Sequence, residues 1–184
     1  MSRMIDNPRE LILGEARKIL YNEGYSSVSI RRVAKECNIS IGTIYNYFPT
    51  KKELILEMMT SYWQEFLDKA AVIIKSREDF YGRLRCIFQE VLSFVGRFKS
   101  VWLSREFYES PDYVEGGIQR EHIYVGRLTA MIEELLGEKA PDKVQAEFEA
   151  KKMASFIIIN FMSMVQNRNY DYDFFEDVLR KLLD

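Results

Sequence analysis

Signals that end and start helices follow one another at short intervals near the N-terminus. Gly24 is a typical stop for a first helix, and Ser29 and Ser40 are good N-caps for a second and a third. Asn38 lies between these two helices and is one of the few non-glycine residues that tolerate a left-handed turn. Pro49 closes the third helix. Short helices joined by a tight turn are typical of a helix-turn-helix, which the spacing therefore predicts.

Apolar residues in these segments recur at the spacing of one helix face. Pro8 can open the first helix, and in the third helix the pattern predicts that Ile44 and Phe48 are buried. The predicted inner faces are Ile12, Leu13, Ala16, Ile19 and Leu20; Ile30, Val33, Ala34 and Cys37; and Ile39, Ile44 and Phe48. The remaining residues of the third helix then lie mostly off the core: Ser40, Ile41, Gly42, Thr43, Tyr45, Asn46 and Tyr47.

This outer surface of the third helix suits the major groove of DNA. A recognition helix presents its N-terminal residues to base edges, while contacts to phosphates from the flanks dominate affinity. Gly42 permits close approach of the backbone to DNA, and Thr43 and Tyr47 offer hydroxyl groups to phosphates. Ile41 or Tyr45 can contact a thymine methyl group. For Tyr45 the spacing fits a core position equally well.

Charge supports the same assignment. Residues 1–52 carry nine Lys and Arg against five Asp and Glu, whereas the remainder carries 17 against 23, for a net charge of −2. A basic head on an acidic body favours a polyanionic partner for the head. Lys51 lies at the start of a predicted fourth helix, where free backbone N–H groups already favour a phosphate. Asn46 can both donate and accept hydrogen bonds.

An ordered pattern runs through residues 8–55: Ala16, Gly24-Tyr25, Ser29, Val33-Ala34, Ile39-Ser40, Gly42-Thr43-Ile44-Tyr45, Tyr47-Phe48, Lys51 and Leu54. With these residues the segment resembles the DNA-binding domain of the TetR (tetracycline-repressor-like) family. The resemblance covers about a quarter of the chain. It implies DNA contacts by Gly42, Thr43, Tyr45, Asn46, Tyr47 and Lys51, with help from positions around Arg31. Ser40 and Ile41 complete the predicted DNA-binding set.

Two positions depart from the family pattern. Asn38 stands where glycine is common, which the left-handed turn accommodates. Ile41 stands where lysine or another polar residue is common, and this removes a charge from the start of the recognition helix.

Helical patterns continue beyond residue 50, and the chain contains only four prolines and nine glycines. Thr50 and Glu53 form a capping box that opens a long fourth helix ending at about 71–75. Further helices are predicted at about 78–97, 100–109, 113–137, 142–166 and 173–183, with breaks at Gly96, Ser110-Pro111, Gly137 to Pro141 and residues 167–171; Gly116-Gly117 is an alternative start for the seventh. The predicted fold is all-α with about nine helices: a helix-turn-helix domain at 1–52 and a larger helical domain at 53–184.

Large apolar side chains in the second domain allow two interpretations. They form a packed core, or some of them line a ligand cavity, since pockets between bundle helices are mainly apolar. The resemblance implies a cavity that binds a small molecule, and the aromatic and methionine content then predicts a small hydrophobic, amphipathic or planar effector. The candidate ligand-binding residues are Tyr62, Trp63, Phe66, Phe88, Trp102, Phe107, Met131 and Met153, with Arg105, Glu106, His122 and Asn160 as candidate polar anchors that also fit structural or surface roles.

The final helix has an apolar stripe that must dock on the body or on a second copy. The resemblance implies a homodimer through the last two helices, at about 142–166 and 173–183, which would read a roughly palindromic operator. The expected function is a ligand-responsive transcriptional regulator, a repressor released from double-stranded DNA when the effector binds. The alternative is an all-helical small-molecule-binding protein whose head does not read DNA specifically.

Other classes of protein are disfavoured by the sequence. His122 has no Ser or Cys partner at a recognisable spacing, so an enzyme is not expected, and no cofactor or metal site is predicted. Cys37 and Cys86 are expected to be reduced and buried. The apolar run Met153–Val165 is shorter than the roughly twenty residues of a membrane span. A soluble, cytoplasmic protein is expected.

Overall fold

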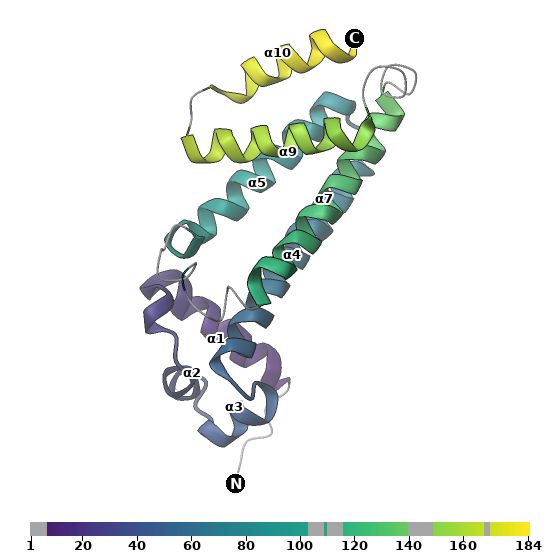
Figure 1. Ribbon diagram of the computed structural model, residues 1–184. Helices are drawn as coiled ribbons and strands as arrows, with labels where there is room; N and C mark the ends of the chain where they lie inside the picture. Colours follow the sequence, from purple (N-terminus) through teal and green to yellow (C-terminus); the bar gives the residue numbers. More distant parts are fainter. Residues whose placement is uncertain (1–6, 103–108, 110–115, 140–148, 168–169) are drawn as a thin grey trace. The chain divides into compact units, whose positions relative to one another are not determined.

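The computed structural model describes residues 7–102, 109, 116–139, 149–167 and 170–184, and the side chains of all of these except 97–102. Every regular element in these ranges is a helix, which confirms the predicted all-α class (Figure 1). The helices are α1 (Pro8–Glu23), the short 3-10 helix η1 (Tyr25–Ser27), α2 (Ile30–Glu36), α3 (Ile41–Tyr47), α4 (Lys51–Ile74), α5 (Phe80–Trp102), α7 (Ile118–Lys139), α9 (Ala150–Asn167) and α10 (Tyr172–Leu183).

The chain forms two compact units. The first unit comprises Met1–Tyr62 and Arg97–Arg120, and the second comprises Trp63–Gly96 and Glu121–Asp184. Helix α4 therefore supplies residues to both units. The domain boundary expected after residue 52 stays a prediction.

Local hydrogen bonds explain why the first unit has three short helices. The Ser29 and Ser40 hydroxyls accept from the backbone N–H groups of residues 32 and 43, as their N-cap assignments require. Gly24 has φ +85° and Asn38 has φ +53°, so both turns use the left-handed half of backbone space. Asn7, which the sequence analysis did not single out, caps α1 with its side chain.

The core of the first unit consists of the predicted apolar faces. Ile44 is the only residue of α3 that is buried, and Phe48, 2% exposed, packs directly after it. Ile39 is half-buried. Buried residues of α1 and α2 complete this core: Ile12, Leu13, Ala16, Ile19, Leu20, Ile30, Val33 and Ala34. Helix α3 is thus anchored by few residues, and most of its surface is left outside the core.

Apolar faces of α4, α5, α7, α9 and α10 build the second unit. Helix α9 buries one broad face and α10 buries Tyr172, Phe175, Leu179 and Leu183. Helix α10 also makes polar contacts with α5, because Arg85 pairs with Asp173 at 2.7 Å and with Glu176 at 2.8 Å. The buried residues of α9 are Met153, Ala154, Ile157, Ile158, Phe161 and Met164.

Two predicted helix ends are wrong. Helix α5 runs through Gly96 to Trp102, and α7 runs through Gly137 to Lys139. A glycine inside a helix costs roughly 1 kcal/mol, and here buried neighbours such as Phe94 and Leu136 outweigh that cost. The predicted separate helix at 100–109 begins inside α5, and its residues 103–108 lie outside the described residues.

Other helix starts differ less from the predictions. A π-helical turn at residues 116–117 precedes α7, so the alternative start after these glycines fits the described part, while 113–115 lie outside it. Helix α9 begins at Ala150, and residues 142–148 of the predicted helix also lie outside the described ranges. Cys37 is buried as expected, whereas Cys86 is only half-buried, contrary to the prediction.

Candidate nucleic-acid interface

The outer surface of α3 is exposed along its whole length. Ile41, Tyr45 and Tyr47 are 41%, 49% and 42% exposed. Ser40, Gly42 and Asn46 are also exposed, and Thr43 is half-buried. The core position that the sequence left open for Tyr45 is therefore excluded. The exposed set coincides with the residues of α3 proposed to meet DNA.

A hydrogen-bonded cap fixes the start of α3. The Ser40 hydroxyl accepts from the Thr43 backbone N–H at 3.0 Å and shares a second hydrogen bond with the Thr43 hydroxyl at 2.8 Å. A Cβ atom at Gly42 would lie 3.6 Å from the Ser40 hydroxyl oxygen, an ordinary contact. Packing within the chain therefore does not require glycine at position 42, which leaves close approach of a partner as a reason for it.

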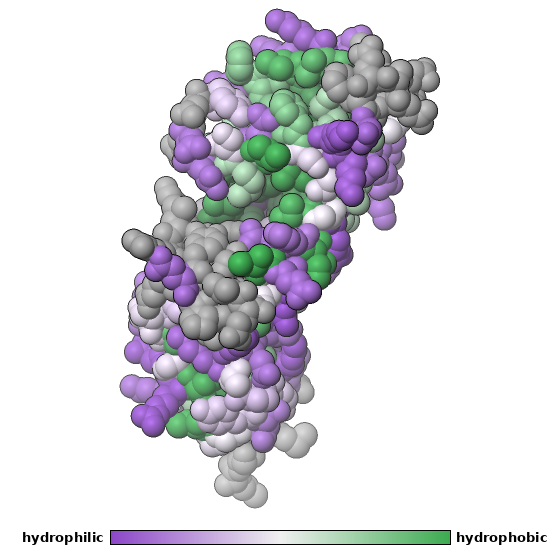
Figure 2. Space-filling view, in the orientation of Figure 1, coloured by the Kyte–Doolittle hydropathy of each residue, from purple (hydrophilic) through white to green (hydrophobic). Residues whose placement is uncertain are grey.

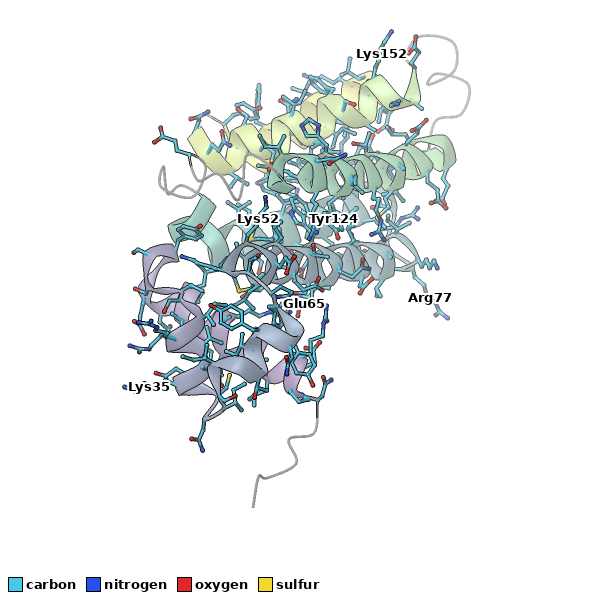
Figure 3. The ribbon with its side chains drawn as sticks, turned by 60° about the horizontal axis from the view of Figure 1, so that its bottom comes forward. Lys35, Lys52, Glu65, Arg77, Tyr124 and Lys152 are labelled. Carbon is cyan, nitrogen blue, oxygen red and sulfur yellow. The ribbon has the colours of Figure 1, made fainter. Side chains whose placement is uncertain are left out.

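Cationic side chains lie on the helices before and after α3. Arg31 and Lys35 are exposed on α2, and Lys35 projects away from the ribbon (Figure 3). Arg32 is held by two acidic residues, Glu23 at 3.1 Å and Glu36 at 3.0 Å. Of the cations on α2, Arg31 and Lys35 thus present exposed charge to a partner, whereas Arg32 is largely neutralised.

Lys51 occupies the first turn of α4, beside the predicted DNA surface. Its ammonium group lies 4.4 Å from the centroid of the Tyr25 ring, within the range of a cation–π interaction. The hydroxyl of Thr50 accepts from the Glu53 backbone N–H at 3.1 Å, which confirms that half of the predicted capping box. The contact between Tyr25 and Lys51 was not predicted, because no helical spacing connects two residues so far apart in the sequence.

Two of the candidate ligand-binding residues meet in an aromatic cluster of the second unit. Trp63 and Phe66 have ring centroids 6.0 Å apart, and both contact Phe94, at 4.7 and 5.1 Å. The Trp63 ring stacks parallel to Tyr124 at 5.6 Å. Phe94 and Tyr124 were not among the predicted ligand-binding residues, since each comes from a different helix with no shared pattern. We call these four residues the α4 aromatic cluster.

The remaining ligand candidates lie elsewhere. Phe88 belongs to another group of rings, 5.0 Å from both Phe161 and Tyr172. Tyr62 belongs to the first unit, where the Arg17 guanidinium lies over its ring at 4.9 Å. Met153 is buried on α9, Met131 is half-buried on α7, the side chain of Trp102 is not described, and Phe107 lies outside the described residues. Ring contacts thus join Trp63 and Phe66 in one cluster and place Phe88 in another, and the full ligand-binding set stays a prediction.

Of the predicted polar anchors, the structure describes His122 and Asn160. His122 is exposed on α7. The Asn160 side chain donates to the Phe156 carbonyl at 2.7 Å and accepts from the Tyr170 hydroxyl at 2.5 Å, so it has a structural role. Arg105 and Glu106 lie outside the described residues. Among the residues that the structure describes, no group of three or more His, Cys, Asp or Glu side chains is placed to hold a metal ion. No described helix is long and apolar enough to cross a membrane.

An exposed apolar surface lies on the last two helices. It comprises Phe156 and Ile159 of α9 and Phe174, Val178 and Leu182 of α10, and hydrophobic side chains are visible over these helices in Figure 2. Ile159 is 67% exposed. A shallow groove of about 450 Å³ is lined by Phe156 and Ile159 together with Glu149, Lys151, Lys152 and Ser155. We call the five apolar residues the α9–α10 surface.

Helices α1, α2 and α3, with the outer surface of α3 exposed, have the arrangement of a helix-turn-helix domain. Residues 12–58 match the family described as bacterial regulatory proteins, tetR family. This match covers about a quarter of the chain, in its N-terminal region.

Relatives of known sequence include two named regulators. QacR of Staphylococcus aureus is 34% identical over 79 residues, which cover 41% of this chain and 42% of QacR. UidR of Escherichia coli is 43% identical over 74 residues, which cover 40% of this chain and 35% of UidR. The chain thus spans less than half the length of these two relatives.

Solved structures resemble almost the whole chain. FadR of Bacillus subtilis, determined in complex with stearoyl-CoA, has a TM-score of 0.66 at 16% identity and covers 95% of this chain and 97% of that one. The TetR family regulator PfmR of Thermus thermophilus has a TM-score of 0.58 at 18% identity, covering 89% of this chain and 87% of PfmR. At such identities these similarities establish the fold alone.

Proposed function

We propose that this protein is a ligand-responsive transcriptional regulator that binds double-stranded DNA through α3 and acts as a repressor. The observation that carries the proposal is the outer surface of α3, where Ile41, Tyr45 and Tyr47 are exposed although the core needs only Ile44 from this helix. A helix anchored in this way is free to enter a major groove, and exposed cations on α2 can contact phosphates from its flank.

We further propose that two copies associate through the α9–α10 surface. Five large apolar side chains exposed on neighbouring helices are typical of an interaction surface. A two-fold dimer presents two recognition helices, so the operator is expected to be roughly palindromic, with half-sites about one helical turn apart or somewhat more.

The proposed effector site is the α4 aromatic cluster. Helix α4 carries both Lys51 in the first unit and Trp63 and Phe66 in the second. A ligand that displaces α4 can therefore alter how the chain meets DNA, provided that it prefers the conformation that does not bind DNA. Because the FadR neighbour was determined with stearoyl-CoA, long-chain acyl-CoA compounds are a suitable first group to screen.

The test compares two exposed tyrosines. A duplex selected by the purified protein from a random pool is titrated with the wild type, Tyr47→Phe and the control Tyr21→Phe; Tyr21 is 62% exposed on α1. Loss of one hydroxyl–phosphate hydrogen bond predicts about fivefold weaker binding for Tyr47→Phe, and no change for the control. If no duplex is bound more tightly than random DNA, the alternative of a small-molecule-binding protein with a non-reading head is supported instead.

The effector step has its own test. A compound that binds and quenches tryptophan fluorescence is added to the protein–DNA complex. The proposal predicts that DNA affinity falls, and by reciprocity that DNA weakens binding of the compound. Unchanged DNA affinity at saturating compound would show that the proposed coupling is absent.

A further inference from the structure

The surface that α3 offers to DNA carries no charge. Its seven residues, Ile-Gly-Thr-Ile-Tyr-Asn-Tyr, include no Arg, Lys, Asp or Glu. The commonest specific contact to guanine is a bidentate hydrogen bond from Arg or Lys to its O6 and N7 atoms, and cytosine is read by Asp or Glu. Neither contact is available from this helix. G·C pairs beneath α3 therefore lack their usual partners.

What α3 does offer suits A·T pairs. Ile41 is the first residue of the helix, and its side chain is 41% exposed. The major-groove edge of a base pair has one apolar group, the C5 methyl of thymine. Asn46 is exposed further along α3, and an amide side chain is the usual bidentate partner of adenine. Ile41, through the thymine methyl group, and Asn46, through adenine, thus both favour A·T pairs.

A cap within the chain holds the backbone at the start of α3. Ser40 caps the helix through the Thr43 backbone and hydroxyl, and these bonds hold the first turn that carries Ile41. Cations that flank α3 in the sequence belong to other helices: Arg31 and Lys35 to α2, and Lys51 to α4. They are placed to neutralise phosphates beside the groove, which contributes affinity without reading sequence.

We propose that the bases covered by α3 are A·T pairs, and that Ile41 specifies a thymine through its C5 methyl group. This inference rests on the proposed function and adds the identity of the base that α3 reads. Ile41 thus determines sequence specificity. The DNA site that it selects has a thymine methyl group in the major groove at the position that meets the start of α3.

The test removes single methyl groups from DNA. Each thymine of the selected half-site is replaced in turn by uracil, which keeps every hydrogen-bonding group and lacks only the methyl. Burial of one methyl group predicts roughly three- to fivefold weaker binding at one thymine position. Replacing that T·A pair by C·G should weaken binding further, and 5-methylcytosine at the same position should recover part of the loss.

The protein side of the test is Ile41→Ala in the full chain. Alanine is the best helix former and position 41 is exposed, so the fold should be kept. The variant should bind thymine and uracil duplexes equally. Ile123→Ala serves as control, since Ile123 is 57% exposed on α7, and should retain the wild-type preference for thymine.

The outcomes separate this inference from the function on which it rests. Specific binding with a uracil effect that disappears in Ile41→Ala supports both. If binding is specific, three results overturn the inference and leave the proposed function standing: no thymine shows a uracil effect, the effect persists in Ile41→Ala, or the bases under α3 prove to be guanine and cytosine. Absence of any sequence-specific binding overturns the proposed function and the inference with it.

Discussion

Removal of the hydroxyl groups of two buried tyrosines in the second unit should change the free energy of unfolding in opposite directions. Tyr172 is 7% exposed, and its buried hydroxyl oxygen has no hydrogen-bond partner among the residues that the structure describes. The Tyr81 hydroxyl, by contrast, donates to Asp184 at 2.9 Å. Burial raises the pKa of Tyr172, and burial together with the Asp184 contact raises that of Tyr81, so both phenols remain protonated at neutral pH.

Substitution of Tyr172 by Phe removes the unpaired hydroxyl and keeps the ring. The ring retains its stacking on Phe88 at 5.0 Å and its place beneath the Arg85 guanidinium at 4.5 Å. An unsatisfied buried hydroxyl costs roughly 1–3 kcal/mol, so a net gain of about 1 kcal/mol in the free energy of unfolding is expected. For a chain of 184 residues, with an unfolding entropy of about 2.1 cal/mol/K per residue, the gain raises Tm by about 2–3 °C.

The matched substitution Tyr81→Phe should act in the other direction. It removes a hydrogen bond to a carboxylate, and a loss of about 1 kcal/mol is expected. Thermal unfolding of wild type and both variants is followed by circular dichroism at one protomer concentration, because association would shift Tm. If Tyr172→Phe is destabilised as much as Tyr81→Phe, the Tyr172 hydroxyl has a partner and the reasoning is refuted.

Further predictions concern the DNA surface, the α9–α10 surface and a thiol. Gly42→Ala should leave Tm unchanged or slightly raised, because its Cβ meets only the Ser40 hydroxyl oxygen at 3.6 Å; DNA affinity by anisotropy should fall at least tenfold if the backbone approaches DNA there, and unchanged affinity would refute that approach. Ile159→Asp should convert a dimer into a monomer in sedimentation, whereas Ile123→Asp, also at an exposed isoleucine, should not; a dimer that survives Ile159→Asp would place the interface elsewhere. Burial, aided by Glu15 and Glu36, raises the pKa of the Cys37 thiol to about 11 from 9.0. At pH 8 a thiol reagent should therefore label the half-buried Cys86 first. As pH rises from 9 towards 11, the free energy of unfolding should fall, because Cys37 then ionises readily only in the unfolded chain. Rapid labelling of Cys37 in Cys86→Ser at pH 8 would contradict this.

Much of the first unit follows from sequence because its structure is set by local signals. Ser29, Asn38 and Ser40 each act on backbone atoms within a few residues, so their positions specify the helix ends directly. The exposed side of α3 follows from the same logic, since Ile44 and Phe48 fix which face is buried. Cap chemistry and helical period together therefore predict both the fold and the candidate surface.

Features that depend on distant residues were not predictable in this way. Lys51 lies over Tyr25, and the α4 aromatic cluster joins Trp63 to Phe94 and Tyr124 from two other helices. Such contacts depend on how helices pack against one another, and no periodic pattern in a single sequence indicates that packing. The predicted helix end at Gly96 was wrong for the opposite reason. Glycine is a local signal for a helix end, but α5 continues through it, next to the buried Phe94.

The most direct test of the central claim is the salt dependence of DNA binding by Lys51→Ala and Lys75→Ala. The two lysines lie at opposite ends of α4, Lys51 in its first turn and Lys75 directly after its last residue. Binding of the selected duplex is measured by fluorescence anisotropy from low to high salt. A phosphate contact by Lys51 predicts that its loss lowers the slope of log affinity against log salt by about one per protomer, while Lys75→Ala keeps the wild-type slope. Equal slopes for wild type and Lys51→Ala, or no preference for the selected duplex, would contradict DNA recognition through this surface.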